Sequence, residues 1–349
     1  MAPVIRAAKA AGIDTSVCVT AQHRGMLDQM MEVFGITPDF DLDLMQDNQS
    51  PTSVAARVLE ALVPVIVSVE PTWLLVQGDT TTAFAAAFVG YQHRVRVGHI
   101  EAGLRTSDKW QPFPEEMNRR LVSVLADLHL APTQRAMDAL MTEGVPAKRI
   151  CVTGNTVVDA LQEILKRPVN FADPRLRTVS GRVVLLTAHR RENFGERLEQ
   201  ICLAALDLLR KFPDITLVFP VHPNPHVMEM AHRLLGGEAR AVLTAPLGYP
   251  DFVHLMKSAT LILSDSGGVQ EEAPSIGTRV LVLRDVTERP EAMESGWAEL
   301  VGTSRSKIFE QATGWLENRN QGALLSKENP FGDGEASARI VRALQQVVE

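Results

Sequence analysis

Short apolar runs rich in β-branched residues alternate with helical segments along almost the whole chain, and this alternation limits the possible folds more than any other feature. Near-continuous apolar strands separated by helices predict parallel sheets covered by helices on both faces. We therefore predict an α/β protein with doubly wound sheets. The predicted strands are TSVCVTA, WLLVQGD, RVGHIEA, LHLAPT and ICVTGN in the first half, and RVVLLTAH, ITLVFPVH, AVLTAP, LILSDS, RVLVLRD and AELVGT in the second.

The division into domains follows from the chain length and from one linker. A chain of 349 residues is long for one core and suits two domains. After Val157 a predicted helix runs into RPVNFADPRLR, a polar segment with prolines, and a second strand–helix series starts at Arg182. We predict a first domain over residues 1–160, onto which the terminal helix 335–349 folds back, and a second domain over 161–334. A ligand is expected in the cleft between the domains, where carboxyl ends of parallel strands meet.

The start of the chain departs from this pattern. A doubly wound domain usually opens on a strand, whereas MAPVIRAAKAAG predicts an amphipathic helix that ends at Gly12. We therefore expect the first strand of the first domain to be missing, an interior position of its sheet to be empty, and Met1 to be an internal methionine of a longer protein.

Charge and cysteine content argue against several classes of protein. The net charge of −7 makes nucleic-acid binding unexpected and means that an anionic substrate needs a locally basic pocket. Three scattered cysteines, Cys18, Cys151 and Cys202, do not support a disulfide framework or a metal site. No apolar stretch of membrane-spanning length and no signal peptide are expected, so we predict a cytoplasmic protein without a membrane partner.

The strongest local motif is LILSDSGGVQEEAPSIG. A strand ends at Asp265, and a helix is expected to begin just after Gly267 and Gly268. These glycines let backbone amides approach a ligand closely, and a helix N-terminus favours a phosphate. Ser266 adds a hydroxyl donor, and Glu272 lies far enough along the helix to reach a ribose diol. The alternative is an ordinary strand-to-helix turn in which Asp265 or Ser266 caps the helix.

Arginine and histidine residues follow other predicted strands of the second half. His189, Arg190 and Arg191 come directly after RVVLLTA. Such groups are costly to bury unpaired, and guanidinium groups match phosphate oxygens, so we interpret them as an anion site. A surface loop is the alternative. Arg289, in RDVTERPEA, could face the same ligand or simply be solvated, and His222, in FPVHPNP, is equally consistent with a structural role.

Carboxylates gather at strand ends in the first half of the chain. Asp79 ends QGD, just before a helix that Asp79 or Thr80 could cap. Glu101 ends another strand, in VGHIEAGLRT. Glu115 and Glu116 begin the helix in PFPEEMNRR, where the helix dipole alone would favour them. Because the carboxyl ends of parallel strands form the catalytic edge of such folds, we interpret these acids as candidates for proton transfer.

Taken together, these motifs resemble those of the non-hydrolysing UDP-N-acetylglucosamine 2-epimerases. The resemblance extends from VCVTAQHRGMLDQM through QGDTTT, GHIEAGLRT, PFPEEMNRR, VTGNTVVDAL, HRRENFG, PVHPNP and SDSGGVQEEAPSIG to RDVTERPEA and NPFGDG. It implies a glycosyltransferase-B-like fold of two Rossmann-like domains, a homodimer, and no nicotinamide or metal cofactor. Members of the family begin with a strand and a GTRPEAIKMAP-like turn, of which only Met1, Ala2 and Pro3 have counterparts here.

The resemblance also implies a reaction. UDP is eliminated from UDP-N-acetylglucosamine and added back to give UDP-N-acetylmannosamine, through a bound 2-acetamidoglucal. The positions that match acid/base residues are Asp79, Glu101 and Glu115, and His189 matches a residue at the diphosphate. The UDP-binding positions are Phe252, Ser266, Gly267, Gly268, Glu272 and Arg289. A second UDP-N-acetylglucosamine activates many members, and the positions near that allosteric site are Gln22, His23, Glu116, Arg190 and His222.

Three other functions share part of this pattern. A glycosyltransferase on the same fold would keep the phosphate contacts but transfer the sugar to an acceptor. A hydrolysing 2-epimerase would release free N-acetylmannosamine and UDP. A protein impaired by the missing N-terminal strand would bind a nucleotide sugar without turnover. The carboxylates of the first domain favour proton transfer and therefore the epimerase.

Overall fold

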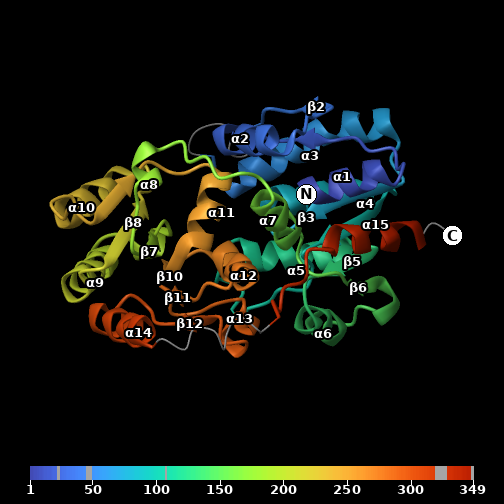
Figure 1. The fold of residues 1–349 in the computed structure, drawn as a ribbon. Helices are drawn as coiled ribbons and strands as arrows, with labels where there is room; N and C mark the ends of the chain where they lie inside the picture. Colours follow the sequence, from blue (N-terminus) through green and yellow to red (C-terminus); the bar gives the residue numbers. More distant parts are fainter. Residues whose placement is uncertain (22–23, 45–48, 107, 319–327, 347–349) are drawn as a thin grey trace. The chain divides into compact units, whose positions relative to one another are not determined.

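The computed structural model divides into two compact units, whose helices and strands are labelled in Figure 1. It describes residues 1–21, 24–44, 49–106, 108–318 and 328–346. Unit 1 comprises Met1–Ala160 and Phe331–Glu349, and unit 2 comprises Leu161–Pro330. The predicted α/β class is confirmed, because parallel sheets and helices make up both units.

Unit 2 is built on a six-stranded sheet in the order β12-β11-β10-β7-β8-β9, and each neighbouring pair is parallel. The chain enters the middle of the sheet with β7, fills one side through β9, and then crosses to the other side with β10. This is the doubly wound order, and the loops after β7 and β10 lie at its switch point. The strands are β7 (Arg182–Thr187), β8 (Ile215–Pro220), β9 (Ala241–Thr244), β10 (Ala259–Ser264), β11 (Val280–Val282) and β12 (Ala298–Leu300).

The helices of unit 2 pack on the sheet through apolar stripes. On α9 the buried residues Leu198, Ile201 and Leu208 recur with helical spacing and join a core that includes Val184 and Phe219 of the sheet. The helices are α8 (Pro174–Arg177), α9 (Glu196–Lys211), α10 (Pro225–Leu235), α11 (Tyr249–Ser258), α12 (Gly267–Ile276), α13 (Pro290–Glu294) and α14 (Arg305–Glu317), with a 3₁₀ turn, η2 (Arg191–Asn193).

Unit 1 contains a four-stranded parallel sheet, β3-β4-β5-β6, and a separate parallel pair, β1-β2. Four predicted strands correspond to β3 (Trp73–Gln77), β4 (Arg96–Ile100), β5 (Leu128–Ala131) and β6 (Ile150–Val152), and TSVCVTA contains β1 (Cys18–Val19). Strand β2 (Phe40–Asp41) was not predicted from the sequence, because it has only two residues and one of them is an aspartate, which is rare in strands. The helices are α1 (Ala2–Ala10), α2 (Arg24–Phe34), α3 (Pro51–Val69), α4 (Thr81–Gln92), α5 (Glu115–Leu125), α6 (Gln134–Thr142) and α15 (Ala336–Gln346), with η1 (Ala147–Arg149). Helix α7 (Thr156–Leu165) begins in unit 1 and ends in unit 2.

Helix α3 corrects one expectation. It has 19 residues and is, by length and composition, long and apolar enough to cross a membrane, so the prediction of no such stretch is wrong. The residues buried on α3 are Val54, Val58, Leu62 and Ile66, each four positions after the last, and they pack against α4 residues in the core. The helix therefore has a packed face within unit 1, as core helices do.

The predicted first helix is confirmed, and its C-terminus is closed as expected. Gly12 has a φ of 73°, its amide donates to the carbonyl of Lys9, and the amide of Ile13 donates to the carbonyl of Ala8. This pair of bonds is a Schellman motif, which glycine adopts without strain. Helix α1 packs against the C-terminal helix α15, and both helices belong to unit 1.

Asp159 of α7 fixes the start of α15. Its carboxylate accepts from the backbone amides of Ala336 (3.2 Å) and Ser337 (2.8 Å), so a side chain far away in sequence caps this helix. We predict that Asp159→Ala lowers the free energy of unfolding by about 1–3 kcal/mol, because the buried amide of Ala336 and the partly buried amide of Ser337 lose their acceptor.

Urea unfolding followed by circular dichroism measures this effect. Asp138→Ala is the matched control, because Asp138 is exposed and accepts from the side chain of Gln134 on the surface of α6. Equal unfolding midpoints for the two variants would show that the cap contributes no more than a surface bond.

Candidate functional site

Asp265 joins the two loops at the switch point of unit 2. It follows β10, its side chain is fully buried, and its carboxylate accepts from the amides of His189 (3.0 Å) and Arg190 (2.9 Å) in the loop after β7. The Nδ2 of Asn193 (3.0 Å) donates to it as well, and the Nδ1 of His189 lies 2.9 Å away. Burial works to raise the pKa of Asp265, but the hydrogen bond and charge of His189 and the amide of Arg190 hold it below its usual value.

This role of Asp265 was not foreseen from the sequence, which suggested only a strand end or a cap. The helix cap position belongs to Ser266, whose side chain makes no cap bond. The available signal was an acid directly after an apolar strand, because an acid that is buried there needs several donors.

Helix α12 begins at Gly267, and Arg289 lies directly over that residue. A Cβ on Gly267 would come within 2.6 Å of Nη1 and 2.9 Å of Cζ of Arg289, so a larger residue does not fit without displacing the guanidinium. Arg289 is itself held by the carboxylates of Glu271 and Glu288. The structure thus places Arg289 against Gly267 at the start of α12, next to Gly268.

Glu272 is buried on α12 and accepts a hydrogen bond from the hydroxyl of Tyr249 at 2.6 Å. Burial, together with the neighbouring charge of Glu271, raises the pKa of Glu272 to about 7. Phe252 is half-buried on α11, the helix that also carries Tyr249. The predicted nucleotide-binding positions of unit 2 therefore lie on α11, on α12 and at the start of α13.

The predicted allosteric residues are distributed over both units and the part of the chain outside the described residues. Arg190 donates from Nε to the carbonyl of Asp265 (2.9 Å). Burial lowers the pKa of His222, and the charge of the nearby His189 lowers it further. Glu116 belongs to unit 1. The remaining two, Gln22 and His23, lie outside the described residues.

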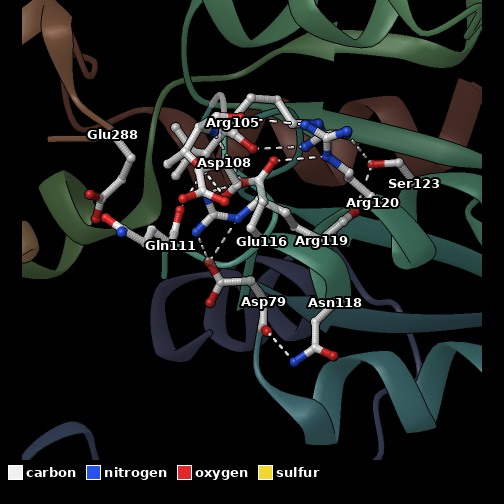
Figure 2. Close-up of polar contacts among 12 residues, drawn as sticks. Asp79, Arg105, Asp108, Gln111, Glu116, Asn118, Arg119, Arg120, Ser123 and Glu288 are labelled. Atoms are coloured by element: carbon white, nitrogen blue, oxygen red, sulfur yellow. Dashed lines mark hydrogen bonds and ion pairs between the residues drawn. The ribbon is translucent and has the colours of Figure 1, made fainter. Parts of the chain in front are cut away.

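In unit 1, Asp79 is not the residue that caps α4. Thr80 does so, with its hydroxyl accepting from the amide of Ala83 at 3.1 Å. The carboxylate of Asp79 instead pairs with Arg119, whose Nε donates at 3.1 Å, while the carbonyl of Asp79 accepts from Asn118 at 2.9 Å (Figure 2). The helix-capping alternative is therefore met by Thr80, and Asp79 remains available for other chemistry.

Glu101 occupies a strained position at the end of β4. Its φ of 66° lies in the left-handed region, which is rare for residues other than glycine and frequent at functional sites. Its Oε2 lies 3.8 Å from where a Cβ of Gly78 would be, and the amide of Gly78 donates to the carbonyl of Ile100 at 3.0 Å. Glu101 thus lies against the turn that carries Asp79.

His99 supports the same turn and was missed by the sequence reasoning. It is fully buried in β4, and its Nε2 lies 2.8 Å from the carbonyl oxygen of Gly78. Burial lowers the pKa of His99 to about 3, so the ring is neutral and Nε2 carries the hydrogen that the carbonyl accepts.

The two glutamates that begin α5 differ in what surrounds them. Glu116 is fully buried, and its carboxylate bonds Arg119 (3.2 Å), Arg120 (2.8 Å) and the amide of Thr106 (3.0 Å), which ties the preceding loop to the helix (Figure 2). Glu115 is half-buried, and within the described part of the chain its carboxylate has no hydrogen bond or ion pair. Glu116 is thus occupied structurally, whereas Glu115 is open to a ligand.

Known proteins resemble this chain over almost its full length. A family model described as UDP-N-acetylglucosamine 2-epimerase matches residues 6–345. The UDP-N-acetylglucosamine 2-epimerase of Yersinia pestis is 47% identical, covering 99% of this chain and 94% of the relative. The structure of UDP-GlcNAc 2-epimerase from Neisseria meningitidis bound to UDP-GlcNAc matches with a TM-score of 0.91 at 43% identity, over 99% of this chain and 96% of that one. The S. aureus MnaA–UDP co-structure matches with a TM-score of 0.92 at 41% identity, over 100% and 93%.

Glu272 predicts a pH dependence of stability. Its pKa is raised from 4.5 to about 7 on folding. The contribution of the protonated Glu272 to the free energy of unfolding is therefore fully present below pH 4.5 and is lost as the pH rises through about 7. Glu272→Gln keeps an acceptor for Tyr249 but cannot ionise. Relative to the wild type, the variant should therefore gain up to about 3 kcal/mol between pH 4.5 and pH 8.

Denaturant unfolding at pH 4.5, 6 and 8 tests this prediction, with the exposed Glu229→Gln as control. Parallel stability curves for the wild type and Glu272→Gln would contradict it.

Proposed function

The chain belongs to the UDP-N-acetylglucosamine 2-epimerase family, and from this premise we propose that it interconverts UDP-N-acetylglucosamine and UDP-N-acetylmannosamine. The reaction inverts carbon 2 of the sugar. Elimination of UDP and its re-addition are redox-neutral steps, so this route requires no hydride carrier.

The chemistry requires elimination followed by addition. The hydrogen at carbon 2 has no adjacent carbonyl to acidify it, so cleavage of the bond from carbon 1 to the UDP oxygen must lead. That electron pair leaves with UDP, a base removes the proton from carbon 2, and the electrons of the broken C–H bond form the double bond of 2-acetamidoglucal. An acid then delivers a proton to the opposite face of carbon 2, and UDP adds back to carbon 1.

Unit 2 supplies the contacts to UDP in this proposal. The start of α12, with Ser266, Gly267 and Gly268, offers backbone amides and a helix dipole to the diphosphate. His189 stands at the same switch point on the loop anchored by Asp265 and stabilises the departing anion. Arg289 adds a guanidinium.

The remaining UDP contacts concern the nucleoside. Glu272 reaches the ribose hydroxyls, and Phe252 packs beside the uracil. Tyr249 holds the carboxyl group of Glu272 in place through its 2.6 Å hydrogen bond, which supports this role for Glu272.

Unit 1 supplies the acid and base groups. The single observation that carries the proposal is the state of Asp79: Thr80 caps α4, so the carboxylate of Asp79 is left at the carboxyl end of β3, paired with Arg119. Glu101 beside it and the open Glu115 complete a set of carboxylates from which one base on each face of the sugar can be drawn.

Assembly and regulation follow the family in this proposal. The chain acts as a cytoplasmic homodimer, and a second UDP-N-acetylglucosamine is its activator. The nearness of Arg190 and His222 to His189 supports an activator that contacts the diphosphate loop of unit 2.

Solvent deuterium tests the reaction. We predict that turnover of UDP-N-acetylglucosamine in deuterated water places deuterium at carbon 2 of the product, because the proton removed exchanges before re-addition. Proton NMR follows this directly. Release of free N-acetylmannosamine would indicate a hydrolysing enzyme, transfer to an added acceptor a glycosyltransferase, and retention of the original hydrogen a route through oxidation.

Two substitutions test the carboxylates. We predict that Asp79→Asn and Glu115→Gln each lower kcat by about a hundredfold or more, the usual contribution of a general acid or base. The Kd for UDP should stay within about twofold, because the UDP contacts lie in unit 2. Initial rates and calorimetry measure the two quantities, and the exposed Glu60→Gln is the control. Near-normal kcat with lower stability would mean that both acids are structural.

A further inference from the structure

Glu272 of α12 is a buried acid without a cation beside it. It is 5% exposed, and within the described residues its carboxylate forms no ion pair, whereas its neighbour Glu271 pairs with the guanidinium of Arg289. A buried carboxylate that lacks an opposite charge needs hydrogen-bond donors instead. The hydroxyl of Tyr249 is such a donor and lies 2.6 Å from Oε1, so the protein itself holds this oxygen.

The other carboxylate oxygen of Glu272, Oε2, faces the start of α12. Glu272 lies one turn after Gly268, and the side chains of a helix point back toward its N-terminus. A Cβ on Gly268 would lie 3.8 Å from this oxygen and 3.9 Å from the Oγ of Ser266. The two oxygens therefore border the space over Gly268, and a ligand in that space meets a carboxylate and a hydroxyl.

Helix α11 adds an aromatic side to this site. Tyr249 is its first residue and Phe252 follows three positions later, so the two side chains share one face of the helix. Helix α11 packs against α12, and the hydrogen bond from Tyr249 to Glu272 joins the two helices. A nucleotide whose base packs on Phe252 and whose phosphates reach the start of α12 has its ribose between them, next to Glu272.

We propose that Tyr249, by holding Glu272, makes this site select ribose over 2′-deoxyribose. The inference rests on the proposed binding of UDP and specifies how the ribose is recognised. With Oε1 held by Tyr249, the carboxylate has a fixed orientation, and Oε2 and the remaining lone pair of Oε1 accept from the 2′- and 3′-hydroxyls. A 2′-deoxyribose would leave one of these acceptor sites without a donor in a buried place, which is costly.

Titratable groups around Glu272 come from α11, from α12 and from the start of α13. Burial raises the pKa of Glu272 to about 7; the hydrogen bond from Tyr249 on α11 opposes this rise, and the charge of Glu271 on α12 adds to it. Arg289, at the start of α13, pairs with Glu271 and Glu288. Tyr249 is therefore the group that keeps the carboxylate of Glu272 ionised to a lower pH.

This effect of Tyr249 gives ribose selectivity a pH dependence. A protonated carboxyl group accepts fewer hydrogen bonds than a carboxylate, so the preference for ribose should rise as the pH passes through about 7. Tyr249→Phe removes the hydroxyl that lowers the pKa of Glu272. In that variant the preference should be weaker at pH 7 and should rise only at a higher pH.

Calorimetry with UDP and 2′-deoxy-UDP at pH 6, 7, 8 and 9 tests the inference. The two ligands share uracil and diphosphate, so the ratio of their Kd values reports the missing hydroxyl alone. For the wild type at pH 8 we expect UDP to bind about tenfold or more tightly than 2′-deoxy-UDP, as one hydrogen bond to a charged group predicts. For Tyr249→Phe at pH 7 we expect a ratio below about threefold.

The chain offers a matched control and an isosteric variant. Its other tyrosine, Tyr91, is 60% exposed on α4 of unit 1, so Tyr91→Phe should keep the wild-type ratio at every pH. Biosynthetic replacement of tyrosine by 3-fluorotyrosine in Tyr91→Phe then changes only position 249 and makes its hydroxyl a stronger donor. The ratio should then rise at a lower pH than in the wild type. Circular dichroism checks the fold of each variant.

The outcomes separate this inference from the proposed reaction. A wild type that binds both ligands equally overturns the ribose contact and the inference, while the deuterium assay still decides the reaction. A wild-type pH profile in both Tyr249→Phe and the fluorinated protein overturns the role of Tyr249 and leaves Glu272 at the ribose. If Tyr249→Phe does not fold, the fluorinated protein alone decides. A wild type that binds neither ligand overturns the proposed function itself.

Discussion

The buried carboxylate of Asp265 is the constraint on which the nucleotide-binding part of this protein depends. A charge without access to water must be surrounded by donors, and here backbone amides and side chains of the loop after β7 supply them. The two loops of the switch point are therefore fixed relative to each other by one group. This arrangement puts His189 and the start of α12 at the edge of the sheet where doubly wound folds bind their ligands.

In unit 1, some polar side chains stabilise the fold, and neighbouring acids are therefore available for the reaction. Thr80 caps α4 and thereby releases Asp79, and Glu116 takes the two arginines and the loop amide and thereby leaves Glu115 open. His99 is kept neutral by burial, so it can only donate to the turn below Asp79 and does not compete for a proton there. Removing Thr80 or Glu116 would therefore impair folding, whereas removing Asp79 or Glu115 would impair catalysis.

Alternating apolar runs were enough to predict the fold class and nearly every strand, since burial in a parallel sheet demands them. The errors have local causes. Strand β2 was missed although apolar residues alternate with aspartates over DFDLDL, because the run has no β-branched residue and aspartate is rare in strands. The length of the apolar helix α3 was underestimated because Arg57 and Glu60 interrupt its apolar sequence. Helix α12 begins earlier than expected, at Gly267, where the guanidinium of Arg289 leaves no room for a Cβ.

The sequence by itself determined which residue types stand at strand ends, because parallel strands place their carboxyl ends at one edge whatever the details. It therefore pointed to Asp79, Glu101, Glu115, His189 and the glycines before α12. Only the tertiary structure decided which of several candidate groups is spent on the fold: Thr80 and not Asp79 caps α4, Glu116 and not Glu115 is held by ion pairs, and Asp265 is an anchor and not a cap. That choice depends on hydrogen-bond partners from distant segments, such as Arg119 for Asp79 and the loop after β7 for Asp265, and no local pattern contains them.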